Sequence, residues 1–148
     1  MTCDEIVLVD SLDSSMKVNN SVLRNGYYNS HFSTGFSNSM DKAICEKATE
    51  LKLDNDDHRY CLIEEIPFDF NNRRVSVILR GPDEKYKIIC KGAVEEILDI
   101  CVKTRKFNSD TDKEDLPLSI EEKQRLLKEC TELNREGYRV LAVASGIP

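Results

Sequence analysis

Apolar residues recur along this chain with two different periods, and each change of period marks a predicted element. A spacing of three and four residues predicts a loose helix over residues 16–32, with Gly26 interrupting the pattern. Residues 33–39 are rich in Ser, Gly and Asn, so we expect a loop there. A clearer amphipathic helix follows. Its apolar positions are Met40, Ala43, Ile44, Ala48 and Leu51.

Shorter runs with a period of two predict strands. A short apolar run at residues 5–9 is the first, and β-prone segments follow at residues 59–66, 73–80 and 85–91. Within residues 73–80, apolar and more polar positions alternate, which is typical of a strand with one buried face. The turn sequence Gly-Pro-Asp at residues 81–83 joins the last two strands, so these two are predicted to form a hairpin.

The helical period returns immediately after Gly92 and predicts an amphipathic helix. Its apolar positions are Val94, Ile97, Leu98, Cys101 and Val102. Residues 107–115 are polar and acidic, and we expect a surface loop there. Ser119 and Glu122 form a capping box that opens the last helix, and Gly137 is placed to end it. The positions expected to be buried on this helix are Ile120, Leu126, Leu127, Cys130 and Leu133.

A final strand is expected over residues 138–144. Together, the elements interleave a hairpin-based sheet with helices, which predicts an α+β fold with a twisted, mainly antiparallel β-sheet flanked by helices. The 148 residues suit one compact domain, so we expect a single domain over residues 1–148.

Charge and hydropathy narrow the classes of partner. The chain has 27 acidic and 21 basic side chains and a net charge of −6, whereas a general nucleic-acid binder has a basic balance. Its apolar runs are far shorter than the roughly 20 residues needed to span a bilayer. The acidic N-terminus lacks the basic region of a signal peptide. We therefore expect a soluble, monomeric domain that neither binds nucleic acid nor inserts into a membrane.

The sequence offers no catalytic or metal-binding constellation. Its six cysteines are widely spread without a C-x-x-C pair, and reduced thiols are the better interpretation. His31 and His58 are the two histidines, and neither lies in a nucleophile-elbow or zinc-ligand context. Residues 54–57 carry carboxylates but lack the Gly and distal Glu of a calcium loop. We expect no metal ligands and no catalytic residues.

Two local features could bind a nucleotide without a P-loop. Lys91 and Gly92 stand at a strand-to-helix junction, where an ammonium group is followed by a residue without a side chain. Phe68 precedes a strand that carries Arg73 and Arg74, and an exposed ring beside guanidinium groups could stack a purine and meet its phosphates. Each feature also has an ordinary explanation, since a lysine at a strand end is usually solvated and a phenylalanine usually belongs to the core.

Taken together, several segments resemble the nucleotide-binding (N) domain of P-type ATPases. These are residues 66–77 (IPFDFNNRRVSV), 91–98 (KGAVEEIL) and 137–144 (GYRVLAVA). Residues 29–30 (NS) and 40–44 (MDKAI) point to the magnesium-transporting branch. So does the sequence AVEE, where calcium pumps typically have Ala-Pro-Glu. The resemblance runs from about residue 2 to residue 148.

The resemblance implies an ATP-binding domain excised from a larger membrane-embedded cation pump, where it would be cytoplasmic. The family's phosphorylated aspartate lies in an Asp-Lys-Thr-Gly-Thr-Leu-Thr motif upstream of a stretch like residues 4–8, and at most Thr2 remains of it here. The implied ligand is ATP, as Mg-ATP in the parent pump. The implied partners are the pump's phosphorylation and actuator domains. The isolated chain is then expected to bind ATP without hydrolysing it.

Four residues match the family's base-binding positions. Phe68 matches the aromatic on which adenine stacks, and Asp41 matches an acidic position near the adenine amino group. Lys91 matches the lysine at the floor of the pocket, and Gly92 matches the small residue beside it.

Two arginines match positions near the rest of the nucleotide. Arg73 corresponds to a basic position near the phosphates, and Arg139 corresponds to one near the ribose and phosphates. Phe70 stands where calcium pumps place an arginine, and Arg73 and Arg74 are the residues placed to compensate.

Two other classes of function remain open from the residues alone. The first is a non-enzymatic protein-interaction domain whose acidic surface recognises basic partners and which binds no nucleotide. The second is a small hydrolase, which is the weakest interpretation because the sequence shows no histidine or metal constellation.

Overall fold

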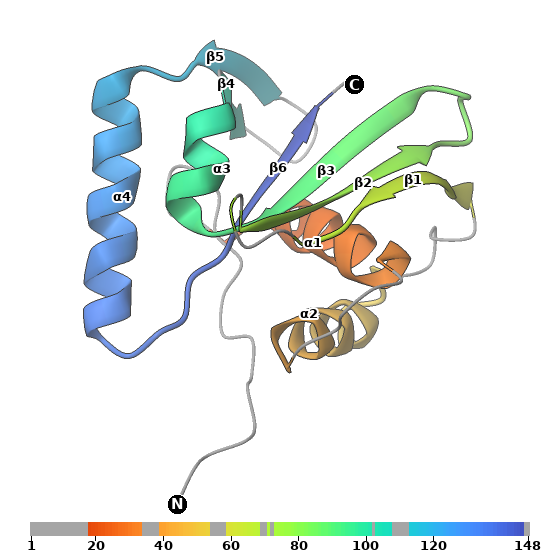
Figure 1. Ribbon diagram of the computed structural model, residues 1–148, viewed down its shortest axis with the longest axis horizontal. Coiled ribbons are helices and arrows are strands. Elements are labelled where there is room, and N and C mark those ends of the chain that lie inside the picture. Colours follow the sequence, from red (N-terminus) through yellow and green to blue (C-terminus); the bar gives the residue numbers. More distant parts are fainter. Residues whose placement is uncertain are drawn as a thin grey trace, which may run out of the picture.

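The computed structural model describes residues 18–33, 39–53, 59–68, 71, 73–101, 103–107 and 113–146. In chain order, the elements are α1 (Asn20–Phe32), α2 (Ser39–Glu50), β1 (Cys61–Ile66), β2 (Arg74–Arg80), β3 (Tyr86–Gly92), α3 (Val94–Ile100), β4 (Lys103–Phe107), β5 (Lys113–Pro117), α4 (Ile120–Arg135) and β6 (Ala142–Gly146) (Figure 1).

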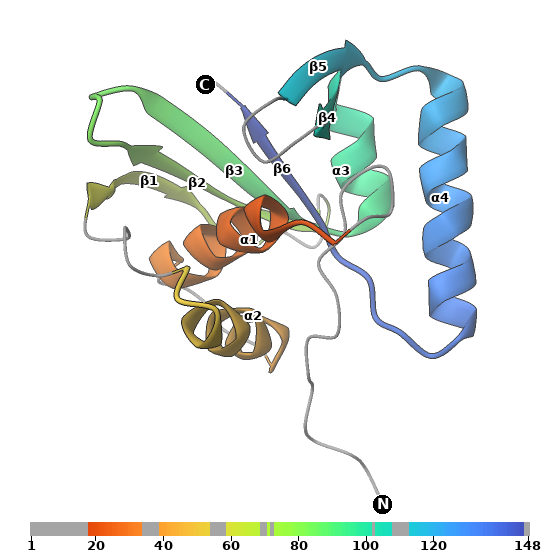
Figure 2. The ribbon, with the colours of Figure 1, turned by 180° about the vertical axis from the view of Figure 1, so that it is seen from behind.

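The main sheet has four strands in the order β1-β2-β3-β6, and every neighbouring pair is antiparallel. Helix α1 packs against β2, β3 and β6, and α2 packs on α1. Helix α3 packs against β3 and β6 on the other side of the sheet, and α4 packs on α3 (Figures 1 and 2). This arrangement confirms the predicted α+β class with a mainly antiparallel sheet flanked by helices.

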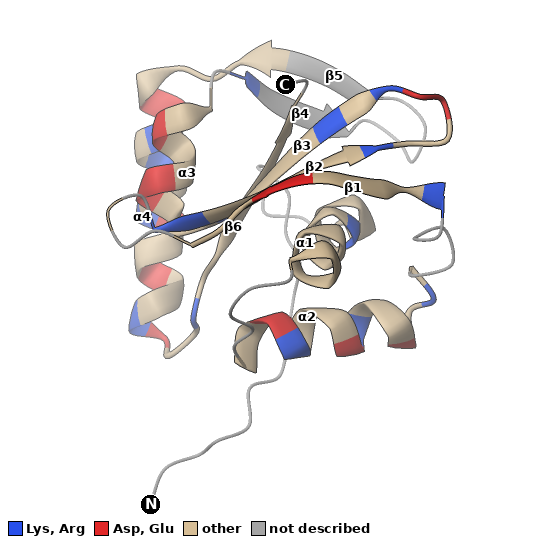
Figure 3. Ribbon diagram, turned by 45° about the vertical axis from the view of Figure 1, so that its right-hand side comes forward, with Lys and Arg blue, Asp and Glu red and all other residues tan. Residues whose placement is uncertain are grey.

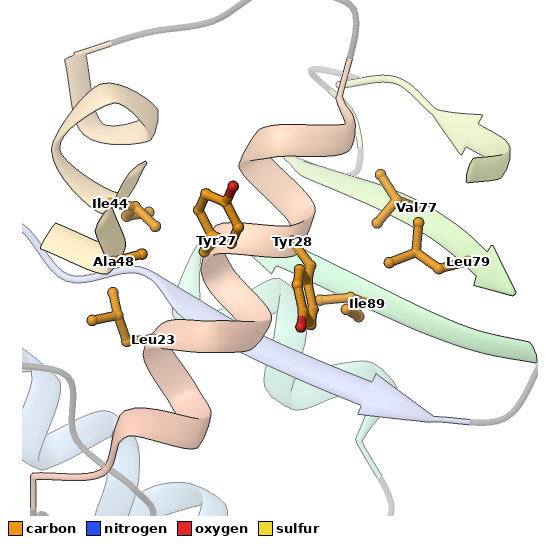
Figure 4. Close-up of a cluster of buried hydrophobic side chains, with 8 residues drawn as sticks. All are labelled: Leu23, Tyr27, Tyr28, Ile44, Ala48, Val77, Leu79 and Ile89. Atoms are coloured by element: carbon orange, nitrogen blue, oxygen red, sulfur yellow. The ribbon is translucent and has the colours of Figure 1, made fainter. Parts of the chain in front are cut away.

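The core lies between α1, α2 and the sheet (Figure 4). Its buried cluster is Leu23, Tyr27, Tyr28, Ile44, Ala48, Val77, Leu79 and Ile89. The alternation predicted for β2 is confirmed, because Val77 and Leu79 are both fully buried. Gly26 lies inside α1, facing Ile44 and Val143, so the glycine does not interrupt the helix.

Capping residues determine where two of the helices begin. Asn19 Oδ1 accepts a hydrogen bond from the backbone N–H of Ser21 at 2.8 Å, so α1 begins at Asn20 and not near residue 16. Ser119 Oγ accepts from the N–H of Glu122 at 3.1 Å, which confirms the predicted cap of α4. Gly137 adopts φ +98°, a left-handed conformation that suits its predicted place after the helix.

Three further sequence predictions were wrong, in part or in full. Residues 107–115 are not entirely a loop, because Phe107 belongs to β4 and residues 113–115 belong to β5, and these two strands are antiparallel partners. The last strand begins at Ala142, since the segment after Gly137 first crosses from α4 to the sheet. None of the residues predicted to be buried on α4 is buried, and Ile120 is 74% exposed, because α4 packs on α3 at the outside of the fold.

Other predictions concern parts of the chain that lie partly or wholly outside the described residues. The strand predicted at residues 5–9 and most of the loop at residues 33–39 are among them. No helix in the described part of the chain is long and apolar enough to cross a membrane. The cysteines of the described ranges are free thiols: Cys45, Cys61, Cys90, Cys101 and Cys130.

Candidate functional site

The segments that carry the predicted nucleotide-binding residues meet at one end of the main sheet. The register pairs Arg74 of β2 with Gly92 of β3, and Gly92 in turn with Ala142 of β6. Strand β1 ends nearby at Ile66, which pairs with Ser76 of β2. The ends of β1 and β3 and the beginnings of β2 and β6 therefore lie together at one end of the sheet, where the candidate residues are found.

A buried ion pair joins two of the predicted residues at this end of the sheet. Lys91, near the end of β3, donates from Nζ to Asp41 Oδ1 in the first turn of α2. The lysine and aspartate side chains are 8% and 14% exposed. A buried charge without its partner is strongly destabilising, so each of these groups requires the other. Lys91, predicted to lie at the pocket floor, and Asp41, predicted to lie near the adenine amino group, thus contact each other directly.

Ser30 joins this ion pair from a third element, α1. Lys91 Nζ donates to Ser30 Oγ at 2.6 Å, and Ser30 Oγ donates to Asp41 Oδ1 at 3.0 Å. We call these three residues the Ser30–Asp41–Lys91 cluster. Ser30 lies in a segment that resembles the family, but its role was not predicted from the sequence, because its partners lie 11 and 61 positions away along the chain.

Asn29 fixes α1 to the sheet directly beside the cluster. Its side chain is fully buried, and Nδ2 donates to the carbonyl oxygens of Val75 at 2.9 Å and Ile89 at 2.8 Å. Val75 is the register partner of Lys91. The contacts of Asn29 therefore hold the C-terminal part of α1 at a fixed height above the two strands.

Gly92 is needed for the close approach of two backbone segments. A Cβ at this position would overlap the carbonyl oxygen of Arg73 and lie 2.9 Å from the Cα of Arg74. Arg73 has φ +50°, and its carbonyl oxygen accepts from the N–H of Ala93 at 3.3 Å. The space that a Cβ would occupy at this position is thus filled by the chain's own backbone.

The Arg73 side chain is half exposed and contacts the beginning of α3. Its Nη2 and Nε lie 3.0 and 3.4 Å from Glu96 Oε1, and Nη2 lies 3.9 Å from Glu95 Oε2. Glu95 and Glu96 lie in the first turn of α3, where acidic residues are favourable because of the helix dipole. An exposed pair of this kind contributes roughly 0–1 kcal/mol, so Arg73 can exchange its carboxylate partner for another anion at little cost.

Phe68 and Arg139 are exposed at the same end of the sheet. Phe68 follows β1 by two residues, and 48% of its surface is exposed. Arg139 lies between α4 and β6, three residues before Ala142. Each follows or precedes a strand of the main sheet, and within the described residues the side chain of Lys91 contacts Asp41 and Ser30. Phe70, the departure from the calcium-pump pattern, lies outside the described residues.

Cys45 lies one helical turn after Asp41 on α2. Burial raises the pKa of its thiol, the positive charge of Lys91 opposes that increase, and Asp41 adds to it. The thiol is therefore protonated near neutral pH and is a poor nucleophile. The charges of Lys91 and Asp41 therefore do not activate the neighbouring cysteine.

Acidic and basic residues are interspersed along α2 and α4 (Figure 3).

Comparisons with known proteins show the family of the chain. The family model of the P-type ATPase, cytoplasmic domain N, matches residues 8–147. A magnesium-transporting ATPase, P-type 1, of Escherichia coli (strain K12) is 38% identical over 146 residues. A calcium-transporting ATPase 1 of Schizosaccharomyces pombe is 30% identical over 108 residues, which cover 73% of this chain and 12% of that protein.

The match to the E. coli protein covers 98% of this chain but 16% of the relative, so the chain spans about a sixth of that length. A second magnesium-transporting ATPase, from Salmonella typhimurium (strain LT2), is 32% identical with the same coverage. The resemblance seen in the sequence is thereby confirmed across nearly all of the chain. The chain belongs to the family of cytoplasmic N domains of P-type ATPases.

Proposed function

We propose that this chain is a single nucleotide-binding domain over residues 1–148 that holds ATP for a cation-transporting P-type pump, with magnesium as the transported ion. In that pump the γ-phosphate of Mg-ATP passes to an aspartate of a separate domain. The observation that carries the proposal is the exposed Phe68 ring at the sheet end where Lys91 and Asp41 form a buried ion pair.

The adenine base supplies most of the binding free energy in this proposal. Stacking a base on an aromatic ring contributes roughly 1–3 kcal/mol, and Phe68 is exposed enough to offer its ring. Asp41 is an acceptor that suits the amino group of adenine. Its pairing with Lys91 holds the carboxylate in place without ligand.

The phosphates meet weaker and more exposed charges. Arg73 is partnered by Glu96 at 3.0 Å, so a phosphate must displace or share that carboxylate. Arg139 offers a second exposed guanidinium on the segment leading to β6. With a net charge of −6, the domain as a whole repels an anion, and local positive charge is needed to admit one. We expect a dissociation constant on the order of 0.1–1 mM for ATP.

The proposal separates binding from chemistry. Phosphoryl transfer requires the metal and the nucleophile in line with the γ-phosphate. In the proposed pump the nucleophilic aspartate belongs to the phosphorylation domain, and the actuator domain is the second partner. This chain therefore binds and presents the nucleotide, and its domain partners complete the reaction.

An NMR titration of the ¹⁵N-labelled chain with ATP, AMP and GTP tests the proposal. We expect saturable shifts confined to residues around Phe68 and the Ser30–Asp41–Lys91 cluster, and AMP should retain much of the affinity of ATP. Amides of the β4–β5 pair serve as the internal control and should not shift. A spectrum unchanged by every nucleotide would refute the proposal and favour an acidic protein-interaction domain.

A further inference from the structure

The hydroxyl group of Ser30 contacts both charged residues of the Ser30–Asp41–Lys91 cluster. It accepts a hydrogen bond from Lys91 Nζ at 2.6 Å and donates one to Asp41 Oδ1 at 3.0 Å. It therefore contacts both charged groups of a pair whose side chains are 8% and 14% exposed. A serine in this position does more than fill space, because it sets the direction in which the ammonium donates.

We propose that Ser30 is a positioning residue that makes the site select adenine over guanine by holding the ammonium of Lys91 on the carboxylate of Asp41. The inference rests on the proposed nucleotide binding and names the residue that controls base choice. Ser30 acts through its two neighbours, and the proposal requires no contact between Ser30 and the base.

The selection follows from the hydrogen-bonding groups of the two purines. Adenine carries an amino donor at position 6, whereas guanine carries a carbonyl acceptor there. A carboxylate only accepts and an ammonium only donates. A site that presents Asp41 to this position therefore favours adenine, and a site that presents Lys91 favours guanine.

The cluster determines which of these groups is presented. Lys91 has three N–H donors, and the contacts with Asp41 and Ser30 use two of them. Removing the Ser30 hydroxyl returns one donor to the lysine and removes one donor from the carboxylate. The ammonium is then able to turn toward the carbonyl oxygen of guanine, and the orientation of Asp41 is no longer fixed.

The neighbouring residue explains why Ser30 can act as a rigid support. Asn29 is fully buried, and its Nδ2 donates to a carbonyl on each of two strands, at 2.9 Å to Val75 and 2.8 Å to Ile89. Val75 pairs directly with Lys91 across the sheet. The helix that presents Ser30 is thus fixed to the strand that presents Lys91.

The test is the ratio of the GTP and ATP dissociation constants, measured by NMR titration of the whole chain and its variants. In Ser30→Ala, the ATP constant should rise about 2- to 12-fold, the effect of losing one hydrogen bond, while the GTP constant stays the same or falls. Ser30→Thr keeps the hydroxyl and should restore the wild-type ratio. Ser119→Ala removes a helix cap remote from the site, so it controls for destabilisation alone and should leave the ratio unchanged.

The possible outcomes separate this inference from the proposed function. A wild-type chain that binds neither nucleotide overturns the proposed function itself. A wild-type chain that prefers ATP, with a ratio that Ser30→Ala leaves unchanged, overturns only the role of Ser30. If Ser30→Ala proves unfolded in its NMR spectrum, Ser30→Cys, which keeps the side-chain volume but is a weak hydrogen bonder, is held to the same criterion.

Discussion

Replacing Gly92 by alanine should damage the fold at the site, because no space exists for a side chain there. The added Cβ would overlap the carbonyl oxygen of Arg73 and lie 2.9 Å from both the Cα and the Cβ of Arg74. Two of these three neighbours are backbone atoms, so the variant can accept the methyl group only if β2 and β3 separate where Arg74 pairs with Gly92. Overpacking usually costs about 1–3 kcal/mol, and the rigid neighbours place this substitution at the upper end.

The chain contains a matched control for this substitution. Gly26 lies inside α1, and a Cβ there would meet the Cγ2 atoms of Ile44 and Val143 at 3.7 Å, an ordinary contact distance. Alanine is favoured over glycine within a helix by roughly 0.8–1.0 kcal/mol. Gly26→Ala should therefore be neutral or stabilising, although both variants add one methyl group.

Thermal unfolding followed by circular dichroism distinguishes the two variants. For a domain of this size, 1 kcal/mol corresponds to about 2–4 °C in Tm, so Gly92→Ala should lower Tm by about 6–12 °C. Gly26→Ala should leave Tm unchanged or raise it by up to about 4 °C. Equal Tm values for the two variants would refute the close backbone approach at Gly92 and with it the geometry of the sheet end.

Three further predictions concern the charges, the thiols and the chemistry of the chain. Lys91→Glu places two carboxylates together in a buried site and should abolish the nucleotide-induced shifts in NMR titrations. Lys103→Glu, at an exposed position, should change the ATP dissociation constant less than about twofold, and equal losses in both variants would mean that only net charge matters. Burial raises the pKa of the Cys45 thiol, so its alkylation by iodoacetamide should begin at higher pH than that of a free cysteine. Mass spectrometry near neutral pH should show that the exposed Cys61 is labelled first, and equal labelling of the two would contradict the burial of Cys45. The purified chain should release no phosphate from Mg-ATP in a malachite green assay, and release that a point substitution in this chain abolishes would contradict the separation of binding from chemistry.

Local signals in the sequence predicted most of the elements because they depend on neighbouring residues. The turn at residues 81–83 joins β2 to β3, and Ser119 and Gly137 mark the limits of α4 as their cap chemistry predicts. The alternation in β2 identified Val77 and Leu79 as core positions. In each of these cases the residue and the feature that it determines lie within a few positions of each other.

The predictions that were wrong depend on tertiary context. The polar segment at residues 107–115 lacks a strand pattern, yet its two ends pair as β4 and β5. The apolar stripe of α4 predicts a buried face, but the helix lies at the outside of the fold and Ile120 is 74% exposed. Periodicity reveals which face of an element is apolar, and it does not reveal how much of that face another element covers.

In the candidate site, too, the sequence predicted individual residues but not the contacts between residues far apart in the chain. The sequence identified Lys91 and Asp41 through a family resemblance, but their direct contact spans 50 positions and became visible only in the structure. Glu96 as the partner of Arg73 was missed for the same reason. One available signal was the acidic pair at the start of α3, opposite in charge to Arg73, which precedes β2, and Arg74, which begins it.

Isothermal titration of ATP into the wild-type chain and Phe68→Ala tests the central claim, adenine binding at this sheet end, most directly. Tyr86→Ala is the matched control, since Tyr86 is also an exposed aromatic (49%, against 48% for Phe68) but lies at the opposite end of β3. We predict that Phe68→Ala weakens ATP binding by about tenfold or more with its Tm nearly unchanged, while Tyr86→Ala binds as the wild type does. Wild-type affinity in Phe68→Ala, or an equal loss in Tyr86→Ala, would contradict it.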